Sequence, residues 1–137
     1  MTLGEYAKKY YLEENQNCAV SLLLGTSDTY NLGLTINDAQ LLAGFGGGMA
    51  CGNLCGALAG AVAAMGKVFL AEGETRSETL TEACRGFVKA FEEKWGTTLC
   101  APIKEKNVKD PETRCQLTVV ETGNMLQEFI DEILKKQ

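Results

Sequence analysis

The chain has 137 residues, of which 45% are hydrophobic and 23% charged, and its net charge is −5. This length and composition predict a single globular domain over residues 1–137, large enough to bury a hydrophobic core. The negative charge and the scattered Lys and Arg residues argue against a nucleic-acid-binding surface, which needs a basic patch. The sequence contains no histidine, which excludes Ser-His and Cys-His catalysis and metal sites with imidazole ligands.

The N-terminal third predicts three short helices. A capping box at residues 2–5 indicates the start of the first helix. An asparagine that is a good N-cap precedes a second helix, expected over residues 18–24, and a polar loop over residues 25–33 follows it. A third helix is expected over residues 35–43, after which the glycine cluster at residues 44–48 turns the chain.

The next stretch, up to about Leu70, is expected to form one helix that carries Cys51 and Cys55. Each glycine inside a helix costs about 1 kcal/mol relative to alanine. A glycine stripe would offset this loss of stability if it let another segment or an inorganic cofactor approach the helix closely. We therefore predict Gly52 and Gly56 as cofactor-binding positions. Glycine recurs at every fourth position of this stretch, at Gly48, Gly52, Gly56 and Gly60.

The same region raises the question of a membrane span. No charged residue occurs between Ala39 and Gly66, a length that could cross a bilayer. Gly and Ala dominate it, however, and they drive membrane insertion weakly. A buried helix of a soluble bundle explains the pattern better. The N-terminal residues 2–15 are polar and charged, unlike a secretory signal, so we expect a cytoplasmic protein.

Two longer helices are predicted in the C-terminal half. The first follows a turn at residues 71–74 and a capping box at residues 75–78, and it ends at Gly96. Residues 97–109 are expected to be a connection, and Asp110 is expected to cap the last helix. No strand or hairpin pattern is convincing, so the predicted fold class is all-α, a compact bundle of about five helices. The apolar faces of these two helices comprise Leu80, Cys84, Phe87, Phe91 and Trp95, and Cys115, Val119, Leu126, Phe129 and Ile133.

The cysteines are the residues with the most evident chemistry. In a reducing cytosol, a cysteine-rich domain is more often metal-binding or redox-active than disulfide-bonded. Cys18 and Cys115 are expected in first turns of helices, where the helix dipole stabilises a thiolate. Cys84 lies on an apolar face and is expected to pack in the core. No CxxC pair occurs, so spacing alone leaves open whether the other thiols share one site. The six are Cys18, Cys51, Cys55, Cys84, Cys100 and Cys115.

Several short motifs are spread over nearly the whole chain: Asn17-Cys18-Ala19, Phe45-Gly-Gly-Gly-Met49, Cys55-Gly-Ala-Leu-Ala-Gly60, Cys100 and Cys115. Together they resemble the C-GCAxxG-C-C family of redox-active proteins. The resemblance implies a helical fold and a redox function. It marks Cys18, Cys55, Cys100 and Cys115 as redox-active thiols and as the ligands of any metal. Cys51 and Cys84 are extra to this set, and Val20 stands where members often carry glutamine.

Three functions stay open at this point. We favour a shared four-cysteine site, which either holds an iron–sulfur cluster, the only cofactor expected, or cycles between dithiol and disulfide. The alternatives are a structural Cys₄ metal site, such as zinc, and a non-catalytic helical interaction module. Whether the protein is an enzyme is left open. The expected partner is an electron-transfer or thiol partner, with a homo-oligomer also compatible, and neither nucleic acid nor a membrane is expected.

Overall fold

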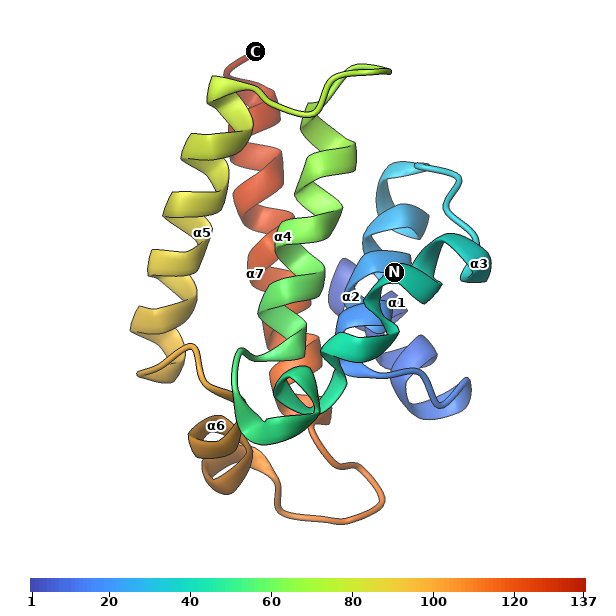
Figure 1. The fold of residues 1–137 in the computed structure, drawn as a ribbon, viewed down its shortest axis with the longest axis vertical. Coiled ribbons are helices and arrows are strands. Elements are labelled where there is room, and N and C mark those ends of the chain that lie inside the picture. The colour runs from blue at the N-terminus through green and yellow to red at the C-terminus, as the bar shows by residue number, and fades with distance from the viewer.

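The protein is all-helical in a computed structural model that describes residues 1–137 (Figure 1). The α-helices are α1 (Leu3–Lys8), α2 (Cys18–Tyr30), α3 (Ile36–Ala39), α4 (Gly56–Phe69), α5 (Glu78–Trp95), α6 (Cys100–Asn107) and α7 (Gln116–Lys135). Three short segments are wound differently from an α-helix: η1 (Lys9–Glu13), η2 (Gln40–Phe45) and η3 (Gly48–Gly52). The only β pairing is an isolated antiparallel bridge between Leu54 and Leu99. The all-α prediction is confirmed, whereas the expected number of about five helices is too low.

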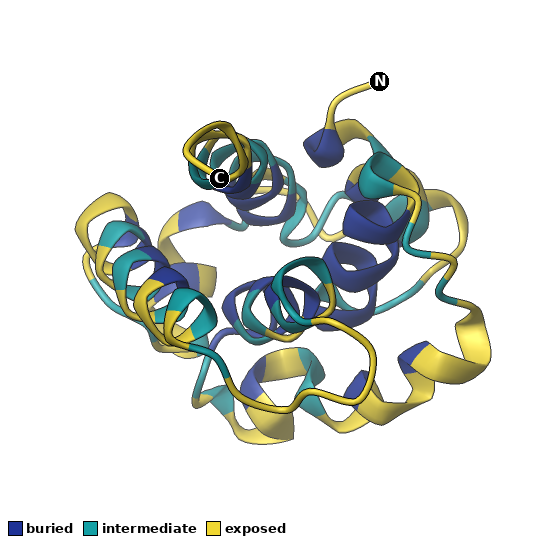
Figure 2. Ribbon diagram, turned by 90° about the horizontal axis from the view of Figure 1, so that it is seen from above, coloured by how far each residue is buried: buried dark blue, intermediate teal, exposed yellow.

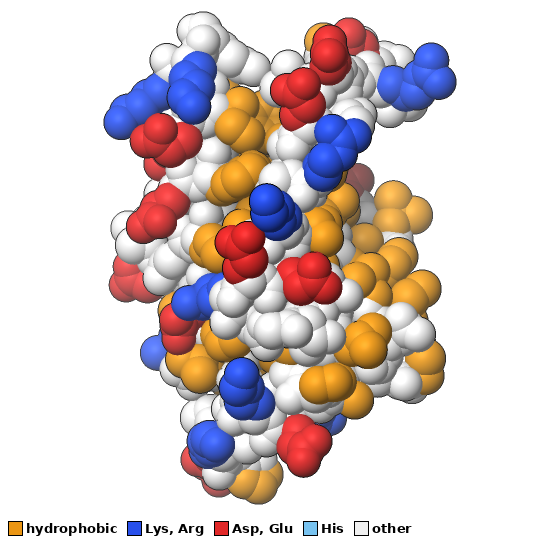
Figure 3. All heavy atoms as spheres, turned by 90° about the vertical axis from the view of Figure 1, so that its left-hand side faces the viewer, with side chains coloured by type: hydrophobic (Ala, Val, Ile, Leu, Met, Phe, Trp, Pro, Cys, Tyr) orange, Lys and Arg blue, Asp and Glu red, His pale blue; other side chains and the backbone are white.

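Helix α4 lies at the centre of the bundle and contacts α2, α5 and α7. Helices α4, α5 and α7 run side by side, α2 packs on the other side of α4, and α1 packs against α2 and α7 (Figure 1). Figure 2 shows the buried faces of these helices turned toward one another. The outer face of α5 carries intermixed acidic and basic side chains (Figure 3). No helix is both long enough and apolar enough to cross a membrane. The largest fully buried side chains include Leu3, Leu22, Leu58, Met65, Phe87, Phe91, Leu126 and Ile130.

Several helix boundaries follow the predicted capping residues. The Thr2 hydroxyl accepts a hydrogen bond from the Glu5 N–H, and the Glu5 carboxylate accepts one from the Thr2 N–H, which forms the capping box of α1. The Asn17 side chain caps α2. Gly96 ends α5 in the left-handed conformation, with a φ of 81°. Local sequence therefore determines these boundaries.

Helix α2 is longer than predicted. It continues through residues 25–30, which we expected to be a loop because they are polar. The Thr26 and Thr29 hydroxyls donate hydrogen bonds to backbone carbonyls four residues earlier in the same helix, so their polar groups are satisfied within it. The helix ends only at Asn31, whose φ is 54°.

The predicted continuous helix carrying Cys51 and Cys55 is wrong. Four successive residues, Gly47 to Ala50, adopt left-handed backbone conformations with φ values of 64°, 67°, 60° and 64°. A side chain at Gly48 would collide with Cys100 and with the backbone of Asn53, so only glycine fits there. Helix α4 begins only at Gly56, and Gly48 and Gly52 are not on its glycine stripe.

Two C-terminal predictions also need correction. The expected connection at residues 97–109 contains helix α6. Pro102 does not interrupt this helix, because it lies in the first turn, where no intrahelical N–H is needed. Helix α7 begins at Gln116 rather than after Asp110. The Asp110 carbonyl accepts the Arg114 N–H, and Arg114 has a φ of 48°, so this segment closes a turn instead of continuing as a helix. The N-cap of α5 is Ser77 rather than the predicted Thr75.

The apolar face of α5 packs as predicted. Phe87 and Phe91 are fully buried, and the Trp95 indole is buried and donates a hydrogen bond to the Thr122 hydroxyl. Cys84 lies on the same face, half-buried against the edge of the core. Helix α5 therefore anchors the C-terminal half of the core and holds Cys84 at its edge.

The glycines of α4 have the close-approach role that the sequence indicated. A Cβ atom at Gly60 would overlap the backbone of Ala19 in α2, including its carbonyl oxygen. A Cβ atom at Gly56 would crowd the Phe45 carbonyl oxygen and the side chain of Cys18. The segment that approaches α4 is thus α2, and the contact is between backbones.

We predict that Gly60→Ala will destabilise the protein by about 1–3 kcal/mol, because α2 must move away from α4 to make room for the methyl group. Urea denaturation followed by circular dichroism measures the free energy of unfolding.

Gly66→Ala is the matched control. Gly66 lies in the same helix with open space where its Cβ would be. This change should stabilise the protein by about 0.5–1 kcal/mol through helix propensity. Equal stabilisation by both substitutions would contradict the close contact.

Candidate functional site

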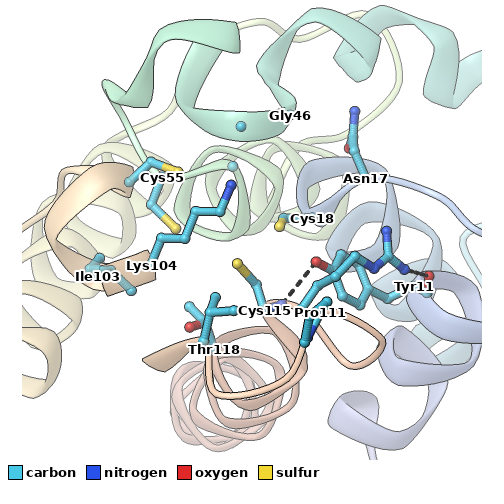
Figure 4. A pocket seen from close by; sticks show the side chains of 15 residues that line it. Tyr11, Asn17, Cys18, Gly46, Cys55, Ile103, Lys104, Pro111, Cys115 and Thr118 are labelled. Carbon is cyan, nitrogen blue, oxygen red and sulfur yellow. Dashed lines mark hydrogen bonds between the residues drawn. The ribbon is translucent and has the colours of Figure 1, made fainter. Parts of the chain in front are cut away.

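Four of the six cysteines line one pocket of about 390 Å³ (Figure 4). This volume is within the range of pockets that bind small molecules. Cys51 is exposed on the left-handed turn and Cys84 lies on α5, and neither lines the pocket. The lining cysteines are Cys18, Cys55, Cys100 and Cys115, the four that the sequence singled out.

Each pocket cysteine stands at the N-terminus of a different helix. Cys18 and Cys100 are the first residues of α2 and α6, and Cys55 and Cys115 directly precede α4 and α7. The first N–H groups of a helix have no intrahelical acceptor and carry the positive end of its dipole. Four helices therefore bring partial positive charge to one pocket, which favours thiolates and other anions there.

The isolated β bridge places Cys55 beside Cys100. Both cysteines directly follow the bridged residues, Leu54 and Leu99. The Cys55 N–H donates to the Thr98 carbonyl at 2.8 Å, and the Cys100 N–H donates to the Asn53 carbonyl. Two chain segments that are far apart in sequence are thus joined just before both helices begin.

Cys18 and Cys115 face each other in the pocket (Figure 4). The neighbouring Cys18 thiol is the largest cause that lowers the pKa of Cys115, to about 6. The neighbouring Cys115, together with burial, raises the pKa of Cys18 well above its usual value. At neutral pH the pair therefore consists of one thiolate, Cys115, and one protonated thiol, Cys18.

Tyr11 supports the Cys115 thiolate. Its hydroxyl oxygen accepts a hydrogen bond from the Cys115 N–H at 3.0 Å, and the nearby Tyr11 hydroxyl also lowers the pKa of Cys115. The Arg114 guanidinium lies over the Tyr11 ring, 4.3 Å from its centroid, and donates to the Tyr11 carbonyl oxygen at 2.9 Å. Tyr11 itself is 4% exposed, so its position is fixed by the core.

The other two pocket thiols are protonated. Burial raises the pKa of Cys55, although the N–H groups of Leu58 and Ala57 partly oppose this rise. Burial also raises the pKa of Cys100, against the attraction of Lys104. The pocket therefore combines one thiolate with three thiols.

Zinc and an iron–sulfur cluster need different arrangements of their cysteine ligands. A zinc ion binds sulfur at about 2.3 Å, so its ligands must converge closely, and no three Cys, Asp or Glu side chains are grouped to hold one metal ion. This geometry does not favour the structural zinc alternative. An iron–sulfur cluster spreads four cysteine ligands around a larger core, and the number of pocket thiols fits it. All six cysteines are free in this structure.

Only one of the two glycines predicted to bind a cofactor lines the pocket. Gly56 lines the pocket together with Gly46 and Gly47, whereas Gly52 lies outside it, against Ala101. Gly46 and Gly47 belong to the glycine cluster that the sequence assigned only to a turn. The pocket wall at these positions is bare backbone.

Sequence reasoning missed the cations and the tyrosine of the pocket. Lys104 lies four residues after Cys100, so recognition of helix α6 would have placed both on one helix face. Arg114 directly precedes Cys115, and this adjacency is the only sequence signal that could have indicated its place in the pocket. Tyr11 reaches the pocket from the opposite end of the chain, and no sequence signal indicated this.

A family model described as "Putative redox-active protein (C_GCAxxG_C_C)" matches residues 16–129. No curated protein and no solved structure matches the chain. The matched region contains all four pocket cysteines and most of the chain, so the chain belongs to this family.

We predict that alkylation of Cys115 by iodoacetamide will rise with pH around a midpoint of about 6, because the reactive thiolate forms there. Peptide mass spectrometry after short labelling pulses measures the rate at this residue. Cys18→Ala should move the midpoint upward by removing the thiol that lowers the pKa of Cys115 most.

Two further variants define this test. Cys18→Ser keeps a hydroxyl donor and should shift the midpoint less than Cys18→Ala. Cys84→Ala is distant from the pocket and should leave it unchanged. A wild-type midpoint near the ordinary cysteine pKa, about 8.5, would contradict the assignment.

Proposed function

We propose that this member of the C_GCAxxG_C_C family carries out thiol–disulfide exchange, with Cys115 as the attacking thiolate and Cys18 as the resolving thiol. The observation that carries the proposal is the pair of facing thiols in one pocket, in which Cys18 lowers the pKa of Cys115. A thiolate beside a protonated partner thiol is the arrangement that two-step exchange requires.

In the first step, the Cys115 thiolate attacks one sulfur of a disulfide substrate. A bond forms between Cys115 Sγ and that sulfur, the substrate S–S bond breaks, and the other half leaves as a thiolate. The Cys18 thiol, already directed at Cys115, can give its proton to this leaving thiolate.

In the second step, the Cys18 thiolate attacks Cys115 Sγ and releases the second half of the substrate as a thiolate, which takes a proton from water. Cys18 and Cys115 have then lost two electrons and the one proton of the Cys18 thiol, and the substrate disulfide has become two thiols, the second of which took its proton from water. A dithiol partner, small or proteinaceous, returns the pair to the reduced state by the reverse exchange.

The neighbouring groups support the first step. Tyr11 holds the Cys115 backbone and stabilises the thiolate, and Arg114 holds Tyr11 from the outer side of its ring. Lys104 and Arg114 both favour negative charge at Cys115. Cys55 and Cys100 take no part in this two-electron exchange.

A second candidate function is supported by the number of thiols in the pocket. Exchange needs two, whereas four line the pocket beside the bare backbone of Gly46, Gly47 and Gly56. Cys18, Cys55, Cys100 and Cys115 would hold an iron–sulfur cluster, and such a cluster supplies one-electron transfer. Three of these thiols would have to lose their protons for it to bind.

We predict that mild oxidation of the reduced protein with bis(2-hydroxyethyl) disulfide will produce a Cys18–Cys115 disulfide. Peptide mapping by mass spectrometry identifies the pair. Cys18→Ser should stop the reaction at a mixed disulfide on Cys115, because the resolving thiol is missing, and Cys115→Ser should abolish both products.

Cys84→Ser is the matched control for this experiment. It should form the pocket disulfide normally and should cost stability only, about 1 kcal/mol, by placing a hydroxyl at the core edge. Unchanged oxidation kinetics in Cys115→Ser would refute the assignment of the attacking thiolate.

Anaerobic reconstitution with iron and sulfide separates the two candidates. If a cluster binds, Cys55→Ser should lose iron, acid-labile sulfide and visible absorption, because one of four ligands is gone, while Cys84→Ser retains them. The same Cys55→Ser variant should retain disulfide exchange through Cys18 and Cys115. Wild-type protein that takes up no iron would eliminate the cluster.

A further inference from the structure

The charge of the pocket is opposite to that of the whole chain. The chain has 18 acidic and 13 basic residues, yet the pocket is lined by no Asp or Glu and by two basic residues, Lys104 and Arg114, which outweigh the single Cys115 thiolate. Neither is paired with a carboxylate, since the salt bridges of the protein join Lys94 to Glu121 and Lys135 to Glu132. The pocket is therefore a local positive site on an acidic protein.

The two cations are supplied by different elements. Lys104 belongs to α6, and its side chain extends into the pocket (Figure 4). Arg114 lies in the turn before α7 and is fixed by Tyr11 through the ring contact and the 2.9 Å hydrogen bond. One cation is thus held in place, and the other is exposed and free to adjust to a ligand.

The rest of the lining limits the size and character of a ligand. The pocket volume of about 390 Å³ suits a small molecule. Ile103, Val108 and Pro111 give it an apolar wall. A short aliphatic chain with a charged end matches both the wall and the cations.

We propose that the substrate of this pocket is a small disulfide with carboxylate groups on short aliphatic arms, and that Lys104 and Arg114 select for it. This inference rests on the thiol–disulfide exchange proposed above. The reaction is the two-step exchange already described, so the substrate disulfide leaves as two carboxylate-bearing thiols.

Stabilisation of the Cys115 thiolate does not by itself account for both cations. In the mixed disulfide the sulfur of Cys115 is neutral, so Lys104 and Arg114 then have no anionic protein group in the pocket to face. A carboxylate on the bound half of the substrate supplies that charge. The cations thus act on the substrate at a stage where the thiolate no longer exists.

Three disulfides of similar length but different charge test this selection: 3,3′-dithiodipropionate (dianion), bis(2-hydroxyethyl) disulfide (neutral) and cystamine (dication). Their second-order rates of reaction with Cys115 are measured by mass spectrometry at pH 8, well above its pKa of about 6, so that the thiolate is fully formed. We expect the dianion to react about tenfold faster than the neutral compound, and the dication to react slowest.

Substitutions at Lys104 give the specific readout. Lys104→Gln should reduce the ratio of dianion to neutral rates several-fold, and Lys104→Glu should invert the order of the three compounds. Lys106→Glu makes the same charge change on the same helix outside this pocket and should leave the order intact. If Lys106→Glu had the same effect as Lys104→Glu, the preference among the three disulfides would come from the net charge of the protein. That result would overturn the assignment of the preference to Lys104 in the pocket.

The outcomes also separate this inference from the proposed function. Equal rates for the three disulfides in the wild-type protein would overturn the substrate class while leaving the exchange reaction in place. Reaction of Cys115 with every disulfide at the rate of a free small thiol would overturn the exchange function, and the inference with it.

Discussion

The backbone contact between α2 and α4 determines where the thiols of this protein lie. Gly56 and Gly60 leave no side chain between the two helices, so Ala19 packs directly against α4. Cys18 begins α2 and Cys55 precedes α4, and this contact therefore brings them into one pocket. The glycines lower helix propensity, but the burial made possible by close packing offsets that loss.

The convergence of four helix N-termini explains the unequal character of the thiols. Each terminus favours an anion, yet four thiolates in one small buried volume would repel one another. The structure concentrates the negative charge on Cys115, where Cys18, Tyr11 and two cations support it, and leaves the other three as thiols. This separation of pKa values gives Cys115 and Cys18 the different protonation states that the proposed exchange uses.

Unfavourable backbone conformations gather beside the pocket. Met49 and Ala50 continue a left-handed turn that glycine residues begin, and Arg114 is left-handed directly before Cys115. Such conformations cost on the order of 1 kcal/mol or more for each non-glycine residue. The Asn53 N–H closes the first turn on the Gly48 carbonyl, and the Asn53 carbonyl in turn accepts the Cys100 N–H. The strained segments thus place two of the four thiols.

Features that depend on neighbouring residues could be predicted from the amino-acid sequence. The helical class, the caps at Thr2 and Asn17, the end of α5 at Gly96 and its buried aromatic face follow from local hydrogen bonding and apolar spacing. The family motifs also pointed to the four cysteines that line the pocket. The remaining features depend on contacts between distant parts of the chain. The helix expected through Cys51 is interrupted because Gly48 packs against Cys100, some 50 residues away in the chain, and Tyr11 meets Cys115 from the other end of it. Contacts of this kind join segments that no local sequence pattern relates. Cys18 and Cys115 therefore face each other, and the pocket acquires its cationic lining, only once the chain has folded.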